Sequence, residues 1–299
     1  MISIIIPVKD EELNVIPLAK SIKESLQYKH ELLFIDDGSI DTTYKKLNLI
    51  KGIKIIKLRK NFGKSTALMH GIKLAKGEYV LMMDGDGEDK PEEINKLYNT
   101  LISSNYDCIV GWRKHRKHSF SKKLFSKFFN YLSSSLTKLK IHDANCGFKI
   151  MTKKAANSLE LRGELHRYIP IILHSKGFKI GEHIVKHEKR KYGKTKYGVF
   201  RLFSGFIDLL TVLFLTRYSK KPSHFFSMVG FLFLILSIFT ESITLYRKFI
   251  LTEYIEIVGT TTALFFITSI FFIFFGLLSE LIISNKNNIE YQIKEVVEQ

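Results

Sequence analysis

The chain has 299 residues, and its 46 Lys and Arg residues outnumber its 29 Asp and Glu residues, giving a net charge of +17. This excess of positive charge favours an anionic partner such as a phosphorylated substrate, nucleic acid or a membrane surface. The length allows one large α/β domain and a smaller part. Two cysteines, Cys108 and Cys146, exclude a disulfide framework and a zinc-binding cysteine cluster. They indicate a reducing compartment, with both thiols in the core.

The first hundred residues alternate between apolar runs and amphipathic stretches. The apolar runs predict four strands, Ile2–Val8, Leu32–Ile35, Ile53–Leu58 and Tyr79–Met83. We expect helices between them, up to about Tyr28, from about Asp41 and over Ser65–Ala75, and another after Pro91. Strands and helices that alternate at this spacing are typical of a mostly parallel, doubly wound sheet. Such sheets bind their ligands beyond the carboxyl ends of the strands.

Acidic residues follow three of the predicted strands, at Asp10–Glu12, Asp36–Asp37 and Asp84–Asp86. Asp84 and Asp86 are two residues apart, a spacing that lets both carboxylates point towards one ligand. Two carboxylates at a strand end suit a divalent cation that also holds phosphate oxygens. The motif is weak when it stands alone, because acidic turns are common on protein surfaces. Its support comes from the rest of the chain.

Three further patterns imitate well-known binding motifs. Gly63-Lys64-Ser65 matches the end of a phosphate-binding loop, but Leu58 stands where the first glycine of that loop is needed. The acidic run that begins at Asp84 imitates a calcium loop, but its sixth position is not glycine. His183 and His187 lack the glutamate that follows the first histidine of a zinc protease helix. We interpret all three patterns as structural or incidental.

Basic residues gather in two segments. Residues 111–142 contain no Asp or Glu, and aromatic residues are interleaved with the lysines and arginines of this segment. This segment is either a solvated basic helix or an amphipathic segment that lies on anionic lipid headgroups. Nucleic acid is not an expected partner, since no base-reading module is recognisable. The second segment, Arg190–Tyr197, offers several cations and a glycine where the backbone can approach a phosphate closely.

Two stretches without Asp, Glu, Lys or Arg follow, and each is about as long as a helix that crosses ~30 Å of hydrocarbon. They lie between Lys221 and Glu241 and between Glu256 and Glu280. We predict an interfacial helix, two transmembrane helices and a cytoplasmic tail, at 199–221, about 225–246, about 257–281 and 285–299. Flanking lysines and arginines favour both ends of the pair in the cytoplasm. A buried core hairpin is the alternative interpretation of these two stretches. At the other end of the chain no signal peptide is expected, because Met1 leads directly into the predicted strand Ile2–Val8.

Together these motifs resemble those of the membrane-associated inverting glycosyltransferases that make polyprenyl-phosphate sugars. These are the dolichyl-phosphate mannose synthase type and its bacterial undecaprenyl-phosphate relatives. The resemblance covers nearly the whole chain and rests on the order and spacing of its motifs. They are Ile6-Pro7-Val8-x-x-Glu11-x-x-Asn14, Ile35-Asp36-Asp37-Gly38-Ser39-x-Asp41, Asn61-Phe62-Gly63-Lys64, Ala75-x-Gly77, Met83-Asp84-Gly85-Asp86, Pro91-Glu92, Gly111-x-Arg113, Cys146-Gly147-Phe148-Lys149 and Arg190-x-x-Gly193-x-Thr195-Lys196. The resemblance implies a GT-A fold, a Rossmann-like α/β domain at 1–198, before a membrane hairpin at 222–284.

The resemblance also implies roles for individual residues. The nucleotide sugar would lie against Pro7, Glu11, Asp36, Asp37, Lys64, Asp84 and Glu88. Mg²⁺ or Mn²⁺ on the donor diphosphate would be held by Asp84, Asp86 and Glu88. Catalysis would depend on Asp86 and on three cations that hold donor and acceptor phosphates, Arg113, Arg190 and Lys196. The chain departs from the family pattern at Glu88, usually Gln, and at Lys149, usually Arg, the better bidentate phosphate ligand.

The reaction implied by the resemblance is inverting transfer of a sugar from a UDP- or GDP-linked donor to a polyprenyl phosphate of the undecaprenyl type. It would take place at the cytoplasmic face of the inner (plasma) membrane, on a multi-pass protein, for modification of cell-envelope glycans. A lipid phosphate with a second pKa of about 6 is largely dianionic at pH 7. It needs alignment and charge screening in place of a strong general base.

Two other functions stay open at this stage. One is a membrane glycosyltransferase that acts on a glycan or glycolipid, although the Gln-x-x-Arg-Trp motif of such enzymes is not found around Trp112. The other is a catalytically inactive, membrane-tethered anion-binding module. Retention of both Asp84 and Asp86 argues against that module. The oligomeric state is open as well, with a homo-oligomer among the options.

Overall fold

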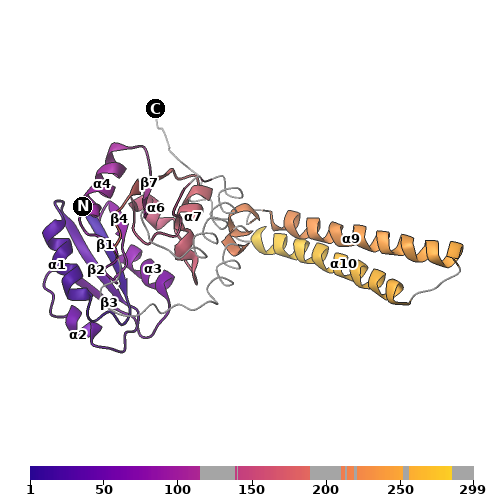
Figure 1. Cartoon of the computed structure of the whole chain (residues 1–299), viewed down its shortest axis with the longest axis horizontal. Coiled ribbons are helices and arrows are strands. Elements are labelled where there is room, and N and C mark those ends of the chain that lie inside the picture. The colour runs from indigo at the N-terminus through magenta and orange to yellow at the C-terminus, as the bar shows by residue number, and fades with distance from the viewer. Residues whose placement is uncertain are drawn as a thin grey trace. The chain divides into compact units, whose positions relative to one another are not determined.

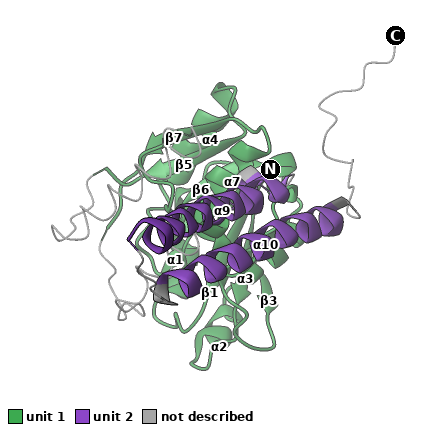
Figure 2. Ribbon diagram, turned by 90° about the vertical axis from the view of Figure 1, so that its right-hand side faces the viewer, with its two compact units in different colours: residues 1–212 green, residues 213–299 purple. Residues whose placement is uncertain are grey.

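The computed structural model describes residues 1–114, 139, 141–188, 210–212, 214–218, 221–251 and 256–284. The chain divides into two compact units, Met1–Val212 and Leu213–Gln299, which are coloured separately in Figure 2. Most of the predicted interfacial helix, residues 199–221, lies outside the described residues. The division into the domains 1–198, 199–221 and 222–284 therefore stays a prediction.

A seven-stranded sheet with the order β3-β2-β1-β4-β6-β5-β7 forms the centre of the first unit. Its strands are β1 (Ile2–Val8), β2 (His30–Asp36), β3 (Lys54–Lys57), β4 (Tyr79–Met82), β5 (Cys108–Trp112), β6 (Lys149–Thr152) and β7 (Ile180–Ile184). β6 pairs antiparallel with β4 and with β5, and the other pairs of strands are parallel. The prediction of a mostly parallel sheet is confirmed.

Helices connect these strands and pack against the sheet (Figure 1). They are α1 (Val15–Ser25), α2 (Thr43–Leu47), α3 (Lys64–Leu74), α4 (Glu93–Ser103), α6 (Lys153–Asn157) and α7 (Ile169–Ser175), with the 3-10 turn η1 (Leu165–Tyr168) before α7. α1 buries Val15, Leu18, Ala19 and Ile22, the spacing of an amphipathic helix. Both predicted core thiols, Cys108 and Cys146, are buried, and burial raises the pKa of each to about 12.

The order of the strands determines where a ligand can bind. β1 lies between β2 and β4, at the point where the order of the strands reverses. Parallel strands bring their carboxyl ends to one edge of the sheet, and a crevice opens there at the reversal. Because β6 runs the opposite way, its amino end reaches this same edge. Residues before β6 therefore meet residues after β1 and β4.

The second unit contains two long apolar helices, α9 (Pro222–Tyr246) and α10 (Glu256–Ser284), with the π-helical turns η2 (Phe214–Tyr218) and η3 (Arg247–Leu251). The two helices run side by side in both views (Figures 1 and 2). The stretches Pro222–Leu251 and Val258–Ile283 are long and apolar enough to cross a membrane. Two such helices were predicted.

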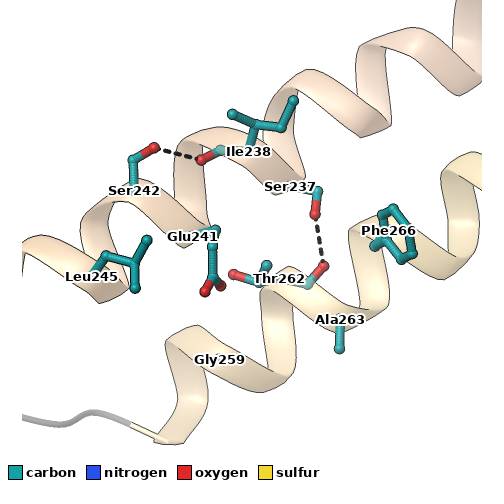
Figure 3. A pocket seen from close by; sticks show the side chains of 9 residues that line it. All are labelled: Ser237, Ile238, Glu241, Ser242, Leu245, Gly259, Thr262, Ala263 and Phe266. Atoms are coloured by element: carbon teal, nitrogen blue, oxygen red, sulfur yellow. Dashed lines mark hydrogen bonds between the residues drawn. The ribbon is translucent and has the colours of Figure 1, made fainter. Parts of the chain in front are cut away.

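Small and hydroxyl-bearing residues hold α9 and α10 together. A Cβ atom built on Gly230 would lie 2.8 Å from Ile273 Cγ1, so this glycine allows the helices to approach closely. Ser237 Oγ donates a hydrogen bond to the carbonyl of Thr262 at 3.1 Å, and Figure 3 shows this bond beside Glu241 in a pocket between the helices. Glu241 thus points towards the partner helix and not away from it.

Candidate functional site

Asp84 stands at the end of β4, beside the reversal of the strand order. Its Oδ1 atom accepts a hydrogen bond from the ammonium of Lys64, at the amino end of α3. Burial raises the pKa of Asp84, but the positive charges of Lys64 and Lys149 outweigh burial and lower that pKa to about 2. Asp84 is therefore a carboxylate at pH 7.

Two glycines allow close packing around Asp84. A Cβ atom on Gly147 would lie 2.6 Å from Asp84 Oδ1, and a Cβ atom on Gly85 would lie 2.5 Å from Val8 Cγ1. Real Cβ atoms do not approach other heavy atoms so closely. The glycine between the two aspartates thus packs against β1, and the segment before β6 packs against the Asp84 carboxylate.

The acidic residues after Asp84 form a turn that is tied to the segment after β7. The backbone N–H of Glu88 donates to Asp86 Oδ1 at 3.1 Å, and His187 Nε2 lies 3.2 Å from Glu88 Oε2. Asp89 forms a β-bridge with His187 and is only 4% exposed. Burial, together with the nearby Asp84 carboxylate, raises the pKa of Asp89 to about 7. The carboxyls of Asp84 and Asp89, five residues apart, therefore have very different pKa values.

Arg113 follows β5 and is held by the segment before β6. Its Nε and Nη2 atoms donate to the two carboxylate oxygens of Asp143 at 2.7 and 2.9 Å. Burial opposes the charge of Arg113, but this pair keeps its pKa above the ordinary value. Glu182 accepts the backbone N–H groups of His142 and Asp143 at 2.7 and 3.0 Å, while His142 stacks on Trp112 at 4.0 Å between ring centroids. The Arg113 guanidinium is thus fixed through two layers of contacts.

The loop after β2 holds Asp36 and Asp37 and supports the start of α3. Asp36 is fully buried, its Oδ1 accepts the N–H of Ser39 at 2.9 Å, and its Oδ2 has no hydrogen-bond partner within the described part of the chain. The Asp37 carboxylate accepts the N–H groups of Phe62 and Gly63 at 2.7 and 2.9 Å. Asp37 therefore fixes the turn that places Lys64.

Pro7 and Glu11 lie beside this loop, at the end of β1. Pro7 pairs with Ile35 on β2 in the parallel register. The N–H of Glu11 donates to Thr43 Oγ1 at 2.8 Å, and its carboxylate accepts Asn14 Nδ2 at 2.6 Å. The structure thus places the predicted nucleotide-binding residues from β1 and β2 along the same edge of the sheet.

The donor set at β4 suits the predicted cation. Asp84 is ionised and Asp86 follows two residues later, and carboxylate oxygens are the ligands that Mg²⁺ and Mn²⁺ prefer. Within the described ranges, no three His, Cys, Asp or Glu side chains are grouped as ligands of one ion. The full ligand set of Asp84, Asp86 and Glu88 therefore stays a prediction. Two carboxylates leave coordination positions to phosphate oxygens and water, as Mg²⁺ sites commonly do.

Two predicted phosphate-binding residues, Arg190 and Lys196, lie outside the described residues, as does most of the basic segment 111–142. Their roles stay predictions. Lys149, which stands where the resembling family usually has arginine, is brought to the site by the segment before β6. It is 2% exposed and donates to the carbonyl of Cys146, and burial lowers its pKa. A lysine at the start of an apolar, strand-like run was a signal that an acidic group, here Asp84, lies near the Lys149 ammonium.

Ser65 and His166 form a second contact that the sequence did not predict. Ser65 Oγ lies 3.1 Å from His166 Nδ1 and accepts the backbone N–H of His166 at 3.2 Å. Gly63-Lys64-Ser65, which we interpreted as structural or incidental, places Lys64 beside Asp84 and Ser65 beside His166 from the first turn of α3. Its place directly after a strand and a turn was the available signal.

Comparisons with known proteins identify the family of the chain. The family model described as Glycosyl transferase family 2 matches residues 3–159. A dodecaprenyl-phosphate galacturonate synthase of Rhizobium johnstonii is 36% identical over 240 residues, which cover 77% of this chain and 71% of that protein. An undecaprenyl-phosphate 4-deoxy-4-formamido-L-arabinose transferase of Proteus mirabilis is 31% identical over 238 residues, with coverages of 77% and 71%.

Solved structures show the same fold at low sequence identity. A glucosyl-3-phosphoglycerate synthase from Mycobacterium tuberculosis, in complex with Mn²⁺, UDP and glucosyl-3-phosphoglycerate, aligns with a TM-score of 0.57 and 15% identity. The alignment covers 72% of this chain and 79% of that one. The predicted GT-A fold is confirmed. The chain is a glycosyltransferase that belongs to glycosyl transferase family 2, where it is related to the polyprenyl-phosphate sugar transferases.

Proposed function

We propose that this glycosyltransferase moves a sugar from a nucleotide-sugar donor to a polyprenyl phosphate, with a divalent metal and with inversion at the anomeric carbon. The observation that carries the proposal is the ionised Asp84 of the Asp84-x-Asp86 motif, held by Lys64 beside the reversal of the strand order. The names of the two curated relatives support the acceptor class, since each name joins a polyprenyl phosphate with a sugar.

The donor would lie along the carboxyl edge of β1, β2 and β4. Pro7, Glu11, Asp36 and Asp37 would surround the nucleoside, and the buried Asp36 oxygen without a partner in the described ranges is an acceptor suited to it. Asp84, Asp86 and Glu88 would hold Mg²⁺ or Mn²⁺ on the diphosphate. When bound, the metal neutralises the charge that develops on the departing nucleotide diphosphate.

The acceptor phosphate supplies its own nucleophile. One phosphate oxygen would form a bond to the anomeric carbon as the bond from that carbon to the donor's β-phosphate oxygen breaks, which inverts the configuration. Two anionic reactants approach each other only if cations screen their repulsion. Arg113, Arg190 and Lys196 would provide that screening. The fixed Arg113–Asp143 pair supports this role, because a guanidinium held in place loses little entropy when it binds phosphate.

We also propose that α9 and α10 span the inner membrane and keep the catalytic unit at its cytoplasmic face. Their length and apolar composition support a membrane-spanning pair, and the flanking lysines and arginines support the cytoplasmic side. A polyprenyl phosphate is confined to the bilayer, so an anchored enzyme meets it at a high effective concentration. The basic segment 111–142 would contact anionic headgroups there.

The test uses the full chain in liposomes that contain undecaprenyl phosphate. A panel of UDP- and GDP-sugars is supplied with Mn²⁺ or Mg²⁺, and the lipid fraction is analysed by mass spectrometry for a polyprenyl phosphate that has gained one sugar. We expect one or a few donors to give this product, and we expect EDTA or Asp86→Asn to remove it. Sugar transfer to an added glycan or glycolipid, with none to the lipid phosphate, would overturn the acceptor assignment. Donor binding without any transfer or hydrolysis would indicate the inactive module.

A further inference from the structure

His166 and Ser65 contact each other through two hydrogen bonds, although they lie far apart in the sequence. Ser65 is 1% exposed, and its Oγ accepts the backbone N–H of His166 at 3.2 Å. Among the described residues, His166 Nδ1, 3.1 Å away, is the acceptor available to the Ser65 hydroxyl proton, so we assign the hydroxyl as the donor of this bond. A neutral imidazole that accepts at Nδ1 carries its proton on Nε2. The serine therefore sets the tautomer of the ring and directs one N–H donor away from α3.

The surroundings keep this imidazole neutral. Burial, followed by the positive charges of Lys64, Lys149 and Arg167, lowers the pKa of His166 to about 2, and Asp84 opposes that shift only weakly. His166 thus lies within electrostatic reach of the Lys64–Asp84 pair. It is a neutral donor among charged groups.

The Nε2–H group has no hydrogen-bond partner among the residues that the structure describes. The nitrogen is not sealed inside the core either, because the buried nitrogens and oxygens that lack a partner do not include it. A half-buried ring with one nitrogen fixed by Ser65 and the other accessible from outside can offer its second nitrogen to a ligand.

The charge of the surrounding groups indicates which part of a ligand this donor meets. Cations such as Lys64 would already balance the charge of a diphosphate bound near Asp84, so a neutral N–H group would add little binding energy there. A neutral N–H group instead contributes a directional hydrogen bond, as in sites that recognise a hydroxyl group. A site built to hydrogen-bond a hydroxyl discriminates strongly against analogues that lack it, because its own donor is then left without a partner.

We propose that the Ser65–His166 pair recognises the transferred sugar: His166 Nε2–H donates to one sugar oxygen, and Ser65 is the positioning residue that fixes the ring. This inference rests on the proposed binding of a nucleotide sugar along the β4 edge. It does not depend on the identity of the acceptor.

Two substitutions of His166 separate the two nitrogens. His166→Asn keeps a polar atom near the position of Nδ1, where it can bond Ser65, but removes the donor at Nε2. His166→Gln places an amide nitrogen near the position of Nε2. Binding by the full chain in detergent with Mn²⁺ is measured by calorimetry for UDP against UDP-glucose and UDP-galacturonate, and for GDP against GDP-mannose. The ratio of the two dissociation constants, nucleotide over nucleotide sugar, gives the sugar contribution for each pair.

For the donor that the wild-type chain binds best, we expect His166→Asn to lower the sugar contribution about 10-fold, the loss of one good hydrogen bond. Affinity for UDP or GDP alone should change less than twofold. His166→Gln should retain most of the contribution, and Ser65→Ala should lose part of it, because the ring is no longer fixed. Melting temperatures of all variants in detergent confirm that each one is folded.

Three results would overturn the proposal. Equal losses for the nucleotide and the nucleotide sugar would place the contact on the diphosphate. An unchanged sugar contribution in His166→Asn would make the pair purely structural, and so would a wild-type chain that binds nucleotide and nucleotide sugar equally. None of these results depends on polyprenyl phosphate. A wrong acceptor assignment would instead show in the transfer assay, while the sugar contribution stays measurable.

Discussion

Replacing Gly147 by alanine tests whether the position of the Asp84 carboxylate matters. The new Cβ atom would lie 2.6 Å from Asp84 Oδ1 and 2.8 Å from both Cγ and Oδ2. Ordinary contacts of a Cβ atom begin at 3.4 Å, so the carboxylate or the segment before β6 must shift by about 0.8 Å, which is 3.4 − 2.6. Gly147 does not have a positive φ, so the substitution adds no backbone strain.

The size of the shift sets the expected effect. A misplacement of about 1 Å at a catalytic site costs roughly 100-fold in rate. We expect kcat/KM for sugar transfer to fall about 30- to 100-fold in Gly147→Ala, equivalent to about 2–3 kcal/mol of transition-state stabilisation. Overpacking costs about 1–3 kcal/mol of folding stability, so the melting temperature is measured beside the rate.

The matched control is Gly177→Ala, after α7. Gly177 has φ +89° and no atom within 4 Å of its built Cβ atom, so alanine there costs about 1–2 kcal/mol of stability without touching Asp84. We expect Gly177→Ala to have a lower melting temperature than the wild-type chain and an unchanged kcat/KM at the temperature of the assay. Wild-type kcat/KM in a folded Gly147→Ala variant would refute the reasoning, because Asp84 would then tolerate displacement. An equal loss in both variants would attribute the effect to stability.

Two further predictions concern folding. Burial raises the pKa of Asp89 to about 7 from 3.8, so the unfolded chain loses this proton first, and the free energy of unfolding falls as pH rises through that interval. Asp89→Asn removes this titration, so its melting temperature relative to wild type should rise from pH 4.5 to pH 8, and a constant difference would contradict the assignment. The second prediction concerns the packing of α9 against α10, where the side chain of Gly230→Ile should push α9 away from Ile273 and Ser269 of α10. This substitution should lower the yield of a Ser237→Cys/Thr262→Cys disulfide, whereas Phe231→Ile, at an exposed position, should leave the yield unchanged.

The sequence predicted the central strands and helices well, for physical reasons that are easy to name. β1 is covered on both faces, so its residues Ile4, Ile5 and Ile6 form an unbroken apolar run. β6 could not be predicted in the same way. It has four residues and begins with the buried Lys149, and its antiparallel direction depends on the neighbours it pairs with.

The candidate site divides along similar lines. Asp84 and Asp86 could be predicted because the apolar strand before them fixes where they stand in the sheet. The partners of the site residues could not be predicted, because they lie far away along the chain. Lys64 and Asp84 are 20 residues apart, and Arg113 and Asp143 are 30 residues apart. Ser65 and His166 are separated by 101 residues. Such pairs follow from the packing of the sheet and not from any local pattern.

The length of the α9–α10 pair has a consequence for the membrane itself. At a rise of 1.5 Å per residue, the 25 residues of α9 extend about 38 Å, while the hydrocarbon core of a bilayer is about 30 Å thick. Hydrogen bonds such as Ser237 to Thr262 fix the register of the two helices, so they adjust together. A pair of this kind meets a thin bilayer by tilting, or by leaving its last turns among the headgroups, at a small cost for each ångström of mismatch. For the proposed membrane-spanning pair, the tilt and the depth of the helix ends would therefore depend on the thickness of the bilayer.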